Sequence, residues 1–275
     1  TYDIVYNNND ILSTFGSKIG YVCLRDRFGC MNKYSPYNMS DILDTFPAGN
    51  ETRNISDIIE KRAEELSNTD KQIYILYSGG VDSTAMLISF IKTMTDYSNL
   101  HIICNDLAID ENKTFYDYLV KNKFDVLGYN DIGHLSVQQE LLDNDDNLVI
   151  AGWCADQLFG SAVNITREQL FFTDWRDWIK VDSAVQQAEE AFNHYNLPIK
   201  NFGQMAWFFN FACKWYFVDY TDVLTHGKFL KHKMISFFNT YDFSNWSVSN
   251  FDRLFEYPQY MTEHYKEDLK NYIFE

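Results

Sequence analysis

Short apolar runs alternate with segments of helical periodicity in the middle of the chain. The runs lie at residues 72–77, 100–104, 124–129 and 147–151. The segments between them repeat apolar residues at the spacing of an amphipathic helix. Strands that alternate with helices are typical of a parallel sheet with helices on both faces. The pattern therefore predicts an α/β fold.

Residues 1–54 precede this pattern and are predicted to form an N-terminal extension. They are polar, with a strand-like run at 19–24 and a turn-like sequence at 25–29, which together indicate a small hairpin. Asn54 offers a side-chain acceptor to the first turn of an amphipathic helix predicted over 55–67. We therefore expect the α/β core to begin at residue 55.

Strand signals fade after residue 165. The segments 175–195, 202–216 and 260–274 are rich in aromatic residues or amphipathic, and each is predicted to be helical. The sequence thus predicts an α/β core over 55–165 and a helical C-terminal part over 166–275 that packs on it.

Composition and charge narrow the class of protein. Of the 275 residues, 46% are hydrophobic and 23% are charged, which excludes a disordered or collagen-like chain. The net charge of −16 disfavours nucleic acid as a partner, because an acidic surface repels phosphate backbones. No apolar run is long enough for a membrane span, and the first residues lack the features of a signal peptide. The five scattered cysteines fit reduced thiols, so a cytoplasmic protein is expected.

The first apolar run is followed by the motif Ser78-Gly79-Gly80-Val81-Asp82-Ser83, which opens the next helix. The two glycines allow a sharp turn and a close approach to an anion, and a helix N-terminus presents unpaired N–H groups. A carboxylate such as Asp82 repels phosphate unless it binds a divalent cation. The motif therefore indicates a site for phosphate and Mg²⁺, and the alternative is an ordinary strand-to-helix turn.

The motif resembles the signature of the PP-loop ATP pyrophosphatases, which cleave ATP between the α- and β-phosphates. The resemblance implies a parallel sheet of the adenine nucleotide alpha hydrolase (HUP) type, with ATP and Mg²⁺ as cofactors. Backbone groups at strand ends hold the adenine in this family, and the matching positions here are Leu76 and Cys104. Within the motif, the resemblance assigns nucleotide binding to Ser78, Gly79, Gly80, Val81, Asp82 and Ser83.

A second motif follows the fourth apolar run. The chain reads Ala151-Gly152-Trp153-Cys154-Ala155-Asp156-Gln157-Leu158-Phe159-Gly160. Asparagine synthetases carry Ser-Gly-Glu-Gly-Ala-Asp-Glu-Leu-Phe-Gly in that place, and six of the ten positions are identical. The resemblance implies that Asp82 and Asp156 share the Mg²⁺–pyrophosphate site and that Gly152 contacts the nucleotide. The alternative for Asp156 is a helix N-cap.

The chain departs from the asparagine synthetase pattern within this motif. Trp153 stands where the family has its catalytic Glu, and Cys154 stands where it has Gly. Trp153 either stacks on the acceptor or fills space, and Cys154 is either a nucleophile or a buried thiol without a chemical role. The pair Asp110-Glu111 resembles an acidic pair of the family and either serves the site or caps a helix.

The family usually supplies a pyrophosphate-binding lysine beyond the point that corresponds to Glu275. Two clusters are candidates to replace it, namely Lys228, Lys231 and Lys233, or Lys266 and Lys270. From these we take Lys233 and Lys266 as catalytic candidates beside the two aspartates. The alternative is that they are only solvated charges on helix faces.

The resemblance implies an ATP-dependent, AMP-forming amide ligase. In such an enzyme a substrate carboxylate attacks the α-phosphorus, pyrophosphate leaves on Mg²⁺, and ammonia or an amine displaces AMP. The chain resembles the synthetase domain without the glutamine amidotransferase domain. The expected partners are therefore a small-molecule carboxylate and an amine or ammonia, with a separate nitrogen-donor protein or a second copy of the chain as further candidates.

Two other functions are kept as alternatives. One is a PP-loop enzyme that modifies a nucleobase or tRNA, which the acidic charge and the lack of a Cys-x-x-Cys motif disfavour. The other is a protein that binds ATP but has lost catalysis, which Trp153 in place of Glu favours.

Overall fold

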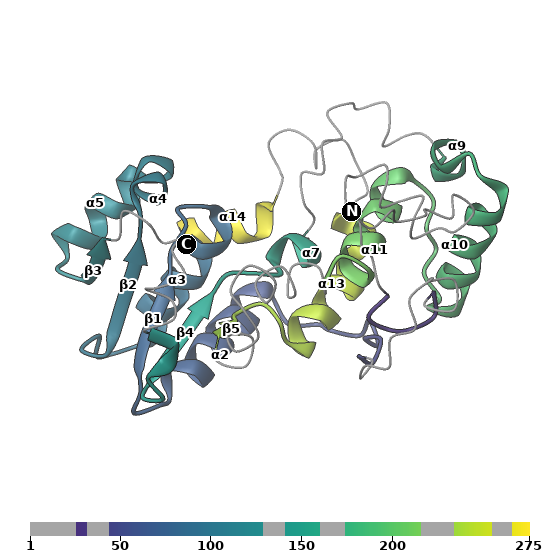
Figure 1. Cartoon of the computed structure of the whole chain (residues 1–275). Coiled ribbons are helices and arrows are strands. Elements are labelled where there is room, and N and C mark those ends of the chain that lie inside the picture. Colours follow the sequence, from purple (N-terminus) through teal and green to yellow (C-terminus); the bar gives the residue numbers. More distant parts are fainter. Residues whose placement is uncertain (1–25, 32–43, 129–140, 160–173, 216–233, 255–265) are drawn as a thin grey trace, which may run out of the picture. The chain divides into compact units, whose positions relative to one another are not determined.

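The structure is a computed structural model of the whole chain, and it describes residues 26–31, 44–128, 141–159, 174–215, 234–254 and 266–275 (Figure 1). The chain divides into two compact units, which we describe separately. The sheet unit comprises Asn50–Ala155, Tyr220–Trp246 and Lys266–Glu275. The helical unit comprises Thr1–Gly49, Asp156–Asp219 and Ser247–Tyr265. Each unit is therefore built from segments that are far apart in the sequence.

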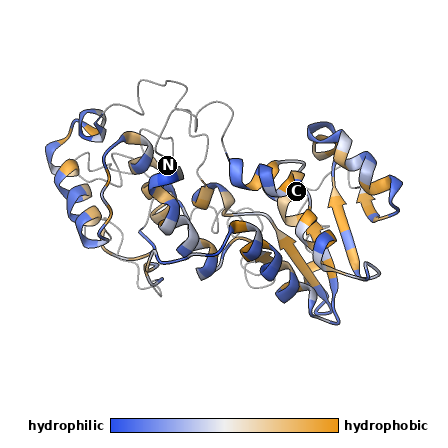
Figure 2. Cartoon of the chain, turned by 180° about the vertical axis from the view of Figure 1, so that it is seen from behind, coloured by the Kyte–Doolittle hydropathy of each residue, from blue (hydrophilic) through white to orange (hydrophobic). Residues whose placement is uncertain are grey.

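The described residues of the sheet unit form five parallel strands in the order β3-β2-β1-β4-β5 (Figure 1). They are β1 (Gln72–Leu76), β2 (Leu100–Cys104), β3 (Asp125–Gly128), β4 (Asn147–Ala151) and β5 (Met234–Ser236). The strands are predominantly hydrophobic, as Figure 2 shows. The predicted α/β fold and parallel sheet are confirmed, and β1 to β4 coincide with the four apolar runs to within one residue at each end.

The fifth strand lies in the part of the chain that the sequence predicts to be helical. It pairs with β4, with Val149 opposite Met234 and Ala151 opposite Ser236. The backbone N–H of Phe237 then donates to the Ala151 carbonyl at 2.8 Å and extends the pairing. A three-residue strand is too short to produce a periodic pattern, so pairing with β4 determines its conformation and the local sequence does not.

Three helices of the sheet unit pack against one another, namely α2 (Ile55–Ser67), α3 (Val81–Thr93) and α14 (Glu267–Phe274). The helix predicted over 55–67 is confirmed as α2, and its buried side chains are Ile55, Ile58, Ile59, Ala63 and Leu66. Asn54 occupies the N-cap position with an extended backbone, but its side chain makes no capping hydrogen bond, so the predicted cap is wrong in that respect.

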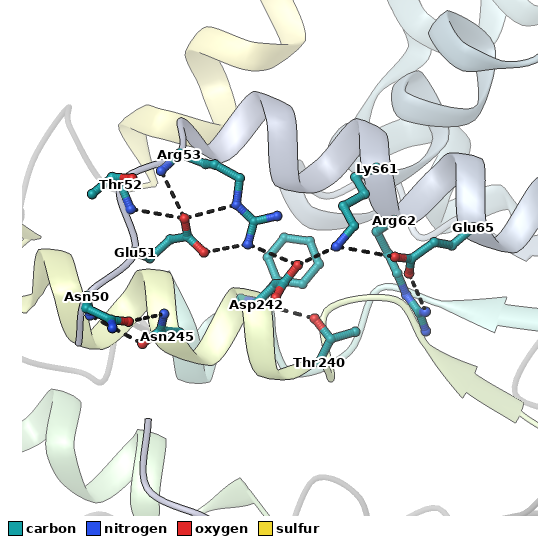
Figure 3. Close-up of polar contacts among 11 residues, drawn as sticks. Asn50, Glu51, Thr52, Arg53, Lys61, Arg62, Glu65, Thr240, Asp242 and Asn245 are labelled. Atoms are coloured by element: carbon teal, nitrogen blue, oxygen red, sulfur yellow. Dashed lines mark hydrogen bonds and ion pairs between the residues drawn. The ribbon is translucent and has the colours of Figure 1, made fainter. Parts of the chain in front are cut away.

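A polar network fastens the start of α2 to the start of α13 (Tyr241–Leu254), as Figure 3 shows. The guanidinium of Arg53 donates to the Glu51 carboxylate at 2.5 Å and to Asp242 at 3.1 Å. The ammonium of Lys61 donates to the same Asp242 oxygen at 3.0 Å. Two segments of the sheet unit that are distant in the sequence are thus joined by charged groups.

The helical unit has an aromatic core. Its described helices include α9 (Trp175–Ile179), α10 (Asp182–His194) and α11 (Phe202–Ala212). The rings of Trp207 and Phe211 stack 5.0 Å apart, and Phe192 packs edge-on against Phe208 at the same separation. Helix α11 is buried along its whole length, which accounts for the absence of a polar face in its sequence.

A turn from the N-terminal segment is pinned to this helical core. The Asp26 carboxylate is fully buried and accepts hydrogen bonds from the backbone of Phe28 and Met31 and from the Tyr195 hydroxyl, at 2.9, 3.0 and 2.9 Å. The guanidinium of Arg27 lies over the Trp215 ring at 3.6 Å. The turn predicted at 25–29 is confirmed for its described residues, whereas the strand predicted at 19–24 lies outside them.

In the parts that the structure describes, no helix is long and apolar enough to cross a membrane.

Candidate functional site

The candidate site lies at the point where the strand order reverses. The chain runs from β1 outward to β2 and β3, and then returns to the other side of β1 to form β4 and β5. In open α/β sheets ligands bind beyond the carboxyl ends of the strands at such a reversal. Both sequence motifs follow strands that flank this point, the first after β1 and the second after β4.

The loop after β1 has a conformation that requires glycine. Gly79 has a φ of +84°, and a Cβ atom there would lie 2.5 Å from the carbonyl oxygen of Ala108. Gly80 occupies the N-cap position of α3 with an extended backbone. The backbone of the loop at Gly79 thus lies directly against the backbone of the segment after β2. Only glycine permits so close an approach, because it has no side chain.

Hydroxyl groups hold the loop in this shape. The Ser83 hydroxyl accepts from the backbone N–H of Ser78 at 3.2 Å, lies 3.0 Å from the Ser78 hydroxyl, and donates to the Gly80 carbonyl at 3.1 Å. The Thr84 hydroxyl donates to the same carbonyl at 2.9 Å. In this state the Ser83 and Thr84 hydroxyls therefore stabilise the loop itself.

The backbone N–H groups of this loop are the hydrogen-bond donors that remain available to a ligand. Within the described part of the chain, the N–H groups of Gly79, Gly80 and Val81 have no hydrogen-bond acceptor. They lie at the N-terminal end of α3, where the helix dipole places partial positive charge. The loop therefore has the chemistry of an anion-binding site.

The loop after β4 approaches the first turn of α3 backbone to backbone. A Cβ atom on Gly152 would lie 3.3 Å from the backbone nitrogen of Ser83. The next residue, Trp153, is held through its carbonyl, which accepts from the Ser236 hydroxyl at 2.9 Å. Strand β5 thus anchors this loop, a role for Ser236 that carries no signal in the sequence.

Cys154 has a left-handed backbone, with a φ of +68°. It is also buried, with 3% of its surface exposed. This conformation favours glycine, and glycine is the residue that asparagine synthetases carry at the matching position. The burial agrees with the interpretation of Cys154 as a thiol packed in the interior.

Asp82 lies in the first turn of α3 and is paired with a lysine from the end of the chain. The Nζ atom of Lys266, 184 residues later, donates to both oxygens of the Asp82 carboxylate. The Lys266 side chain is 4% exposed and the Asp82 side chain is 23% exposed. The structure thus brings together one predicted aspartate and one predicted lysine.

The family resemblance predicts that backbone groups at the ends of β1 and β2 hold adenine. Leu76 ends β1 and is paired with Ile103, so that it lies beside Cys104 at the end of β2. Cys104 is fully buried, and this burial raises the pKa of its thiol, with a further contribution from Asp106. The pair therefore presents backbone groups at the same edge of the sheet as the loop.

The acidic pair after β2 lies at a helix end and not at a helix start. Asp110 and Glu111 are the last residues of α4 (Asp106–Glu111), and Asn112 caps the following helix α5 (Lys113–Lys121) through its side chain. Of the two alternatives for this pair, the helix cap is therefore wrong, and a role at the site stays a prediction. A Cβ on Gly80 would lie 3.5 Å from a carboxylate oxygen of Glu111, so this carboxylate borders the loop.

Two predicted residues are not brought to the loop by the described geometry. Asp156 lies in the first turn of α7 (Ala155–Phe159) and begins the second segment of the helical unit, so its convergence with Asp82 stays a prediction. Lys233 lies outside the described residues, as do Lys228 and Lys231. Among the residues that the structure describes, no three His, Cys, Asp or Glu side chains form a metal-binding group.

Comparisons with known proteins add no assignment. A scan against protein-family models finds no match to this chain. A search of curated proteins also finds no match.

Proposed function

We propose that this chain is an ATP-dependent, AMP-forming amide ligase of the asparagine synthetase type, built on a HUP-type sheet. The observation that carries the proposal is the loop after β1. It presents unpaired N–H groups at the point where the strand order of the parallel sheet reverses. These groups lie beside the Asp82 carboxylate, which already binds the ammonium of Lys266. The left-handed backbone at Cys154 supports the alignment with the second asparagine synthetase motif.

The residues present fit ATP and Mg²⁺. The N–H groups of Gly79, Gly80 and Val81 would hold phosphate oxygens, and Asp82 would bind the metal. Mg²⁺ is commonly bound by one or two carboxylates together with substrate phosphates, and two carboxylates are what Asp82 and Asp156 would supply. When bound, the metal would neutralise the charge of the pyrophosphate leaving group.

The remaining work of the site is positioning and charge neutralisation. Lys266 would place its ammonium against the pyrophosphate, and Leu76 and Cys104 would contact the adenine through their backbones. Gly152 would let the loop after β4 approach the nucleotide closely. Ser78 and Ser83 would keep the loop in shape and so keep its donors aligned before the substrate arrives. The acceptor is a small carboxylate, and the nitrogen comes from ammonia or an amine.

The proposal is tested by incubating the protein with ATP, Mg²⁺, pooled carboxylates and ammonium or amines. We expect pyrophosphate and AMP as products, together with an adenylated species detectable by mass spectrometry. Asp82→Asn and Asp156→Asn should each abolish pyrophosphate release. Asp117→Asn, which removes an exposed carboxylate paired with Lys113 on α5, is the matched control and should retain it. Release of inorganic phosphate instead of pyrophosphate would contradict the assignment.

A second candidate is an ATP-binding protein without catalysis. Trp153 favours it, because a tryptophan stands where the family has its catalytic Glu and an indole cannot exchange a proton with a substrate near neutral pH. Calorimetric binding of ATP and Mg²⁺ without pyrophosphate release from any acceptor would select this candidate. Co-purification of tRNA would instead favour the nucleobase-modifying alternative.

A further inference from the structure

The position of Lys266 is unfavourable by every local criterion. Its backbone is left-handed, with a φ of +52°, although it is not glycine. It precedes the first turn of α14, where the helix dipole disfavours a cation, and its side chain makes no capping hydrogen bond. Its ammonium is also almost entirely buried. Conflicts of this kind between local preference and structure occur preferentially at functional sites.

The contact with Asp82 offsets these costs. The ammonium donates to both carboxylate oxygens, and the N-terminus of α3 favours the negative charge of Asp82. Lys266 therefore neutralises the same carboxylate that the proposed function assigns to the divalent cation.

Helix α14 is also fastened to α3 at its other end. The Lys92 ammonium donates to the backbone carbonyl of Tyr272 at 3.3 Å and lies 4.2 Å from the centre of its ring. Leu269 and Tyr272 are buried, so the helix packs against the unit along one face. The contact at Asp82 can therefore change while the second half of α14 stays in place.

We propose that Lys266 is a built-in cation that occupies the metal position on Asp82 until a metal–nucleotide complex replaces it. The ammonium already donates to both oxygens of the Asp82 carboxylate, so a divalent cation that binds there takes over at least one of them and repels the ammonium. Entry of the metal therefore displaces Lys266 from Asp82 and releases the first turn of α14. The triphosphate then provides the anionic partner for the displaced ammonium. This inference rests on the proposed function, since it assigns Asp82 to the metal.

The test uses Mn²⁺ alone as the probe, in calorimetry and electron paramagnetic resonance, together with hydrogen exchange of residues 267–274. Lys266→Met removes the competing cation and should tighten Mn²⁺ binding about tenfold, the size of a typical coupling between two sites. Lys266→Arg keeps the charge and should stay close to the wild type. In the wild type, Mn²⁺ should accelerate exchange in the first turn of α14, whereas in Lys266→Met that turn should exchange rapidly with or without Mn²⁺.

Lys92→Met is the matched control, because it removes the other fastening of α14 and leaves Asp82 untouched. It should loosen the second half of the helix without changing Mn²⁺ affinity, and Asp82→Asn should remove the Mn²⁺ site from every variant. Equal Mn²⁺ affinity in the wild type and Lys266→Met, or no binding that depends on Asp82, would overturn the inference. If these effects appear but pyrophosphate release never does, the displacement of Lys266 stands and the proposed ligase activity fails.

Discussion

The carbonyl oxygen of Ala108 lies 2.5 Å from the point that a Cβ atom on Gly79 would occupy. This contact joins the loop after β1 to the segment after β2, and it is a contact between two backbones. Neither partner can move aside as the end of a flexible side chain would.

We therefore predict that Gly79→Ala lowers the free energy of unfolding by about 2 kcal/mol or more, because it adds a clash to a left-handed backbone. Urea denaturation measures the effect. Gly128→Ala is the control, since nothing lies within 4 Å of a Cβ there, and it should be close to neutral. Equal effects of the two substitutions would contradict the loop geometry.

At Cys154 the glycine variant should be more stable than the alanine variant, which is the reverse of the usual order at a buried position. At a φ of +68°, Cys154→Gly should be more stable than Cys154→Ala by about 1 kcal/mol, because glycine adopts this backbone without a Cβ penalty. Cys213 is also fully buried but has a φ of −112°, so there the alanine variant should be the more stable one. Thermal or urea unfolding of the four variants provides the comparison, and the same order at both positions would rule out the left-handed backbone.

The network around Glu51 should make stability depend on pH. Hydrogen bonding from the Arg53 side chain is the largest cause that lowers the Glu51 pKa, from 4.5 to about 2. The unfolded chain therefore binds more protons than the folded chain between these values, so this contribution is present above pH 4.5 and is lost as the pH falls toward 2. Glu51→Gln should lose less stability than the wild type when urea unfolding is repeated at decreasing pH from 6 to 3.

The control for this experiment is Glu64→Gln, an exposed carboxylate on helix α2, which follows Glu51 in the chain. Its pH profile should follow that of the wild type. A Glu51→Gln profile parallel to the wild type would show that the carboxylate is not paired as Figure 3 depicts.

Tyr195 should contribute to stability through its hydroxyl. Tyr195→Phe removes a donor from the buried Asp26 carboxylate and an acceptor from the backbone N–H of Cys30. The expected loss is about 1–3 kcal/mol, the cost of leaving buried polar groups without a partner. Tyr118→Phe removes the hydroxyl of an exposed tyrosine on α5 and should be neutral in the same denaturation assay. A neutral result for Tyr195→Phe would contradict the pinned turn.

The sequence predicts the sheet well because strands β1 to β4 can each be recognised from their local composition. Each is an apolar run next to a helical period, and burial on a parallel sheet requires such runs. Strand β5 could not be found in this way, since its three residues form a strand only through pairing with β4.

The candidate site could be predicted only in part. Glycine and serine motifs carry their own signal, so the loop after β1 is visible in the sequence. Lys266 is one of two lysines that the sequence analysis takes as catalytic candidates, but its contact with Asp82 depends on the packing of α14 on α3, which local sequence does not encode. Ser236 was missed for the same reason, since its proximity to the loop after β4 arises from tertiary structure.

The position of β5 in the chain also determines the order in which the sheet unit can form during synthesis. Strands β1 to β4 emerge first, and the Asp156–Asp219 segment of the helical unit follows before β5 is made. The outer edge of β4 therefore stays without its partner β5 during this interval. An unpaired strand edge is a template for association with other chains. Pairing across the 83 residues that separate Ser236 from Trp153 is non-local and correspondingly slow. The outer edge of β4 is consequently open to association with other chains during synthesis until residues 234–236 are made and pair with it.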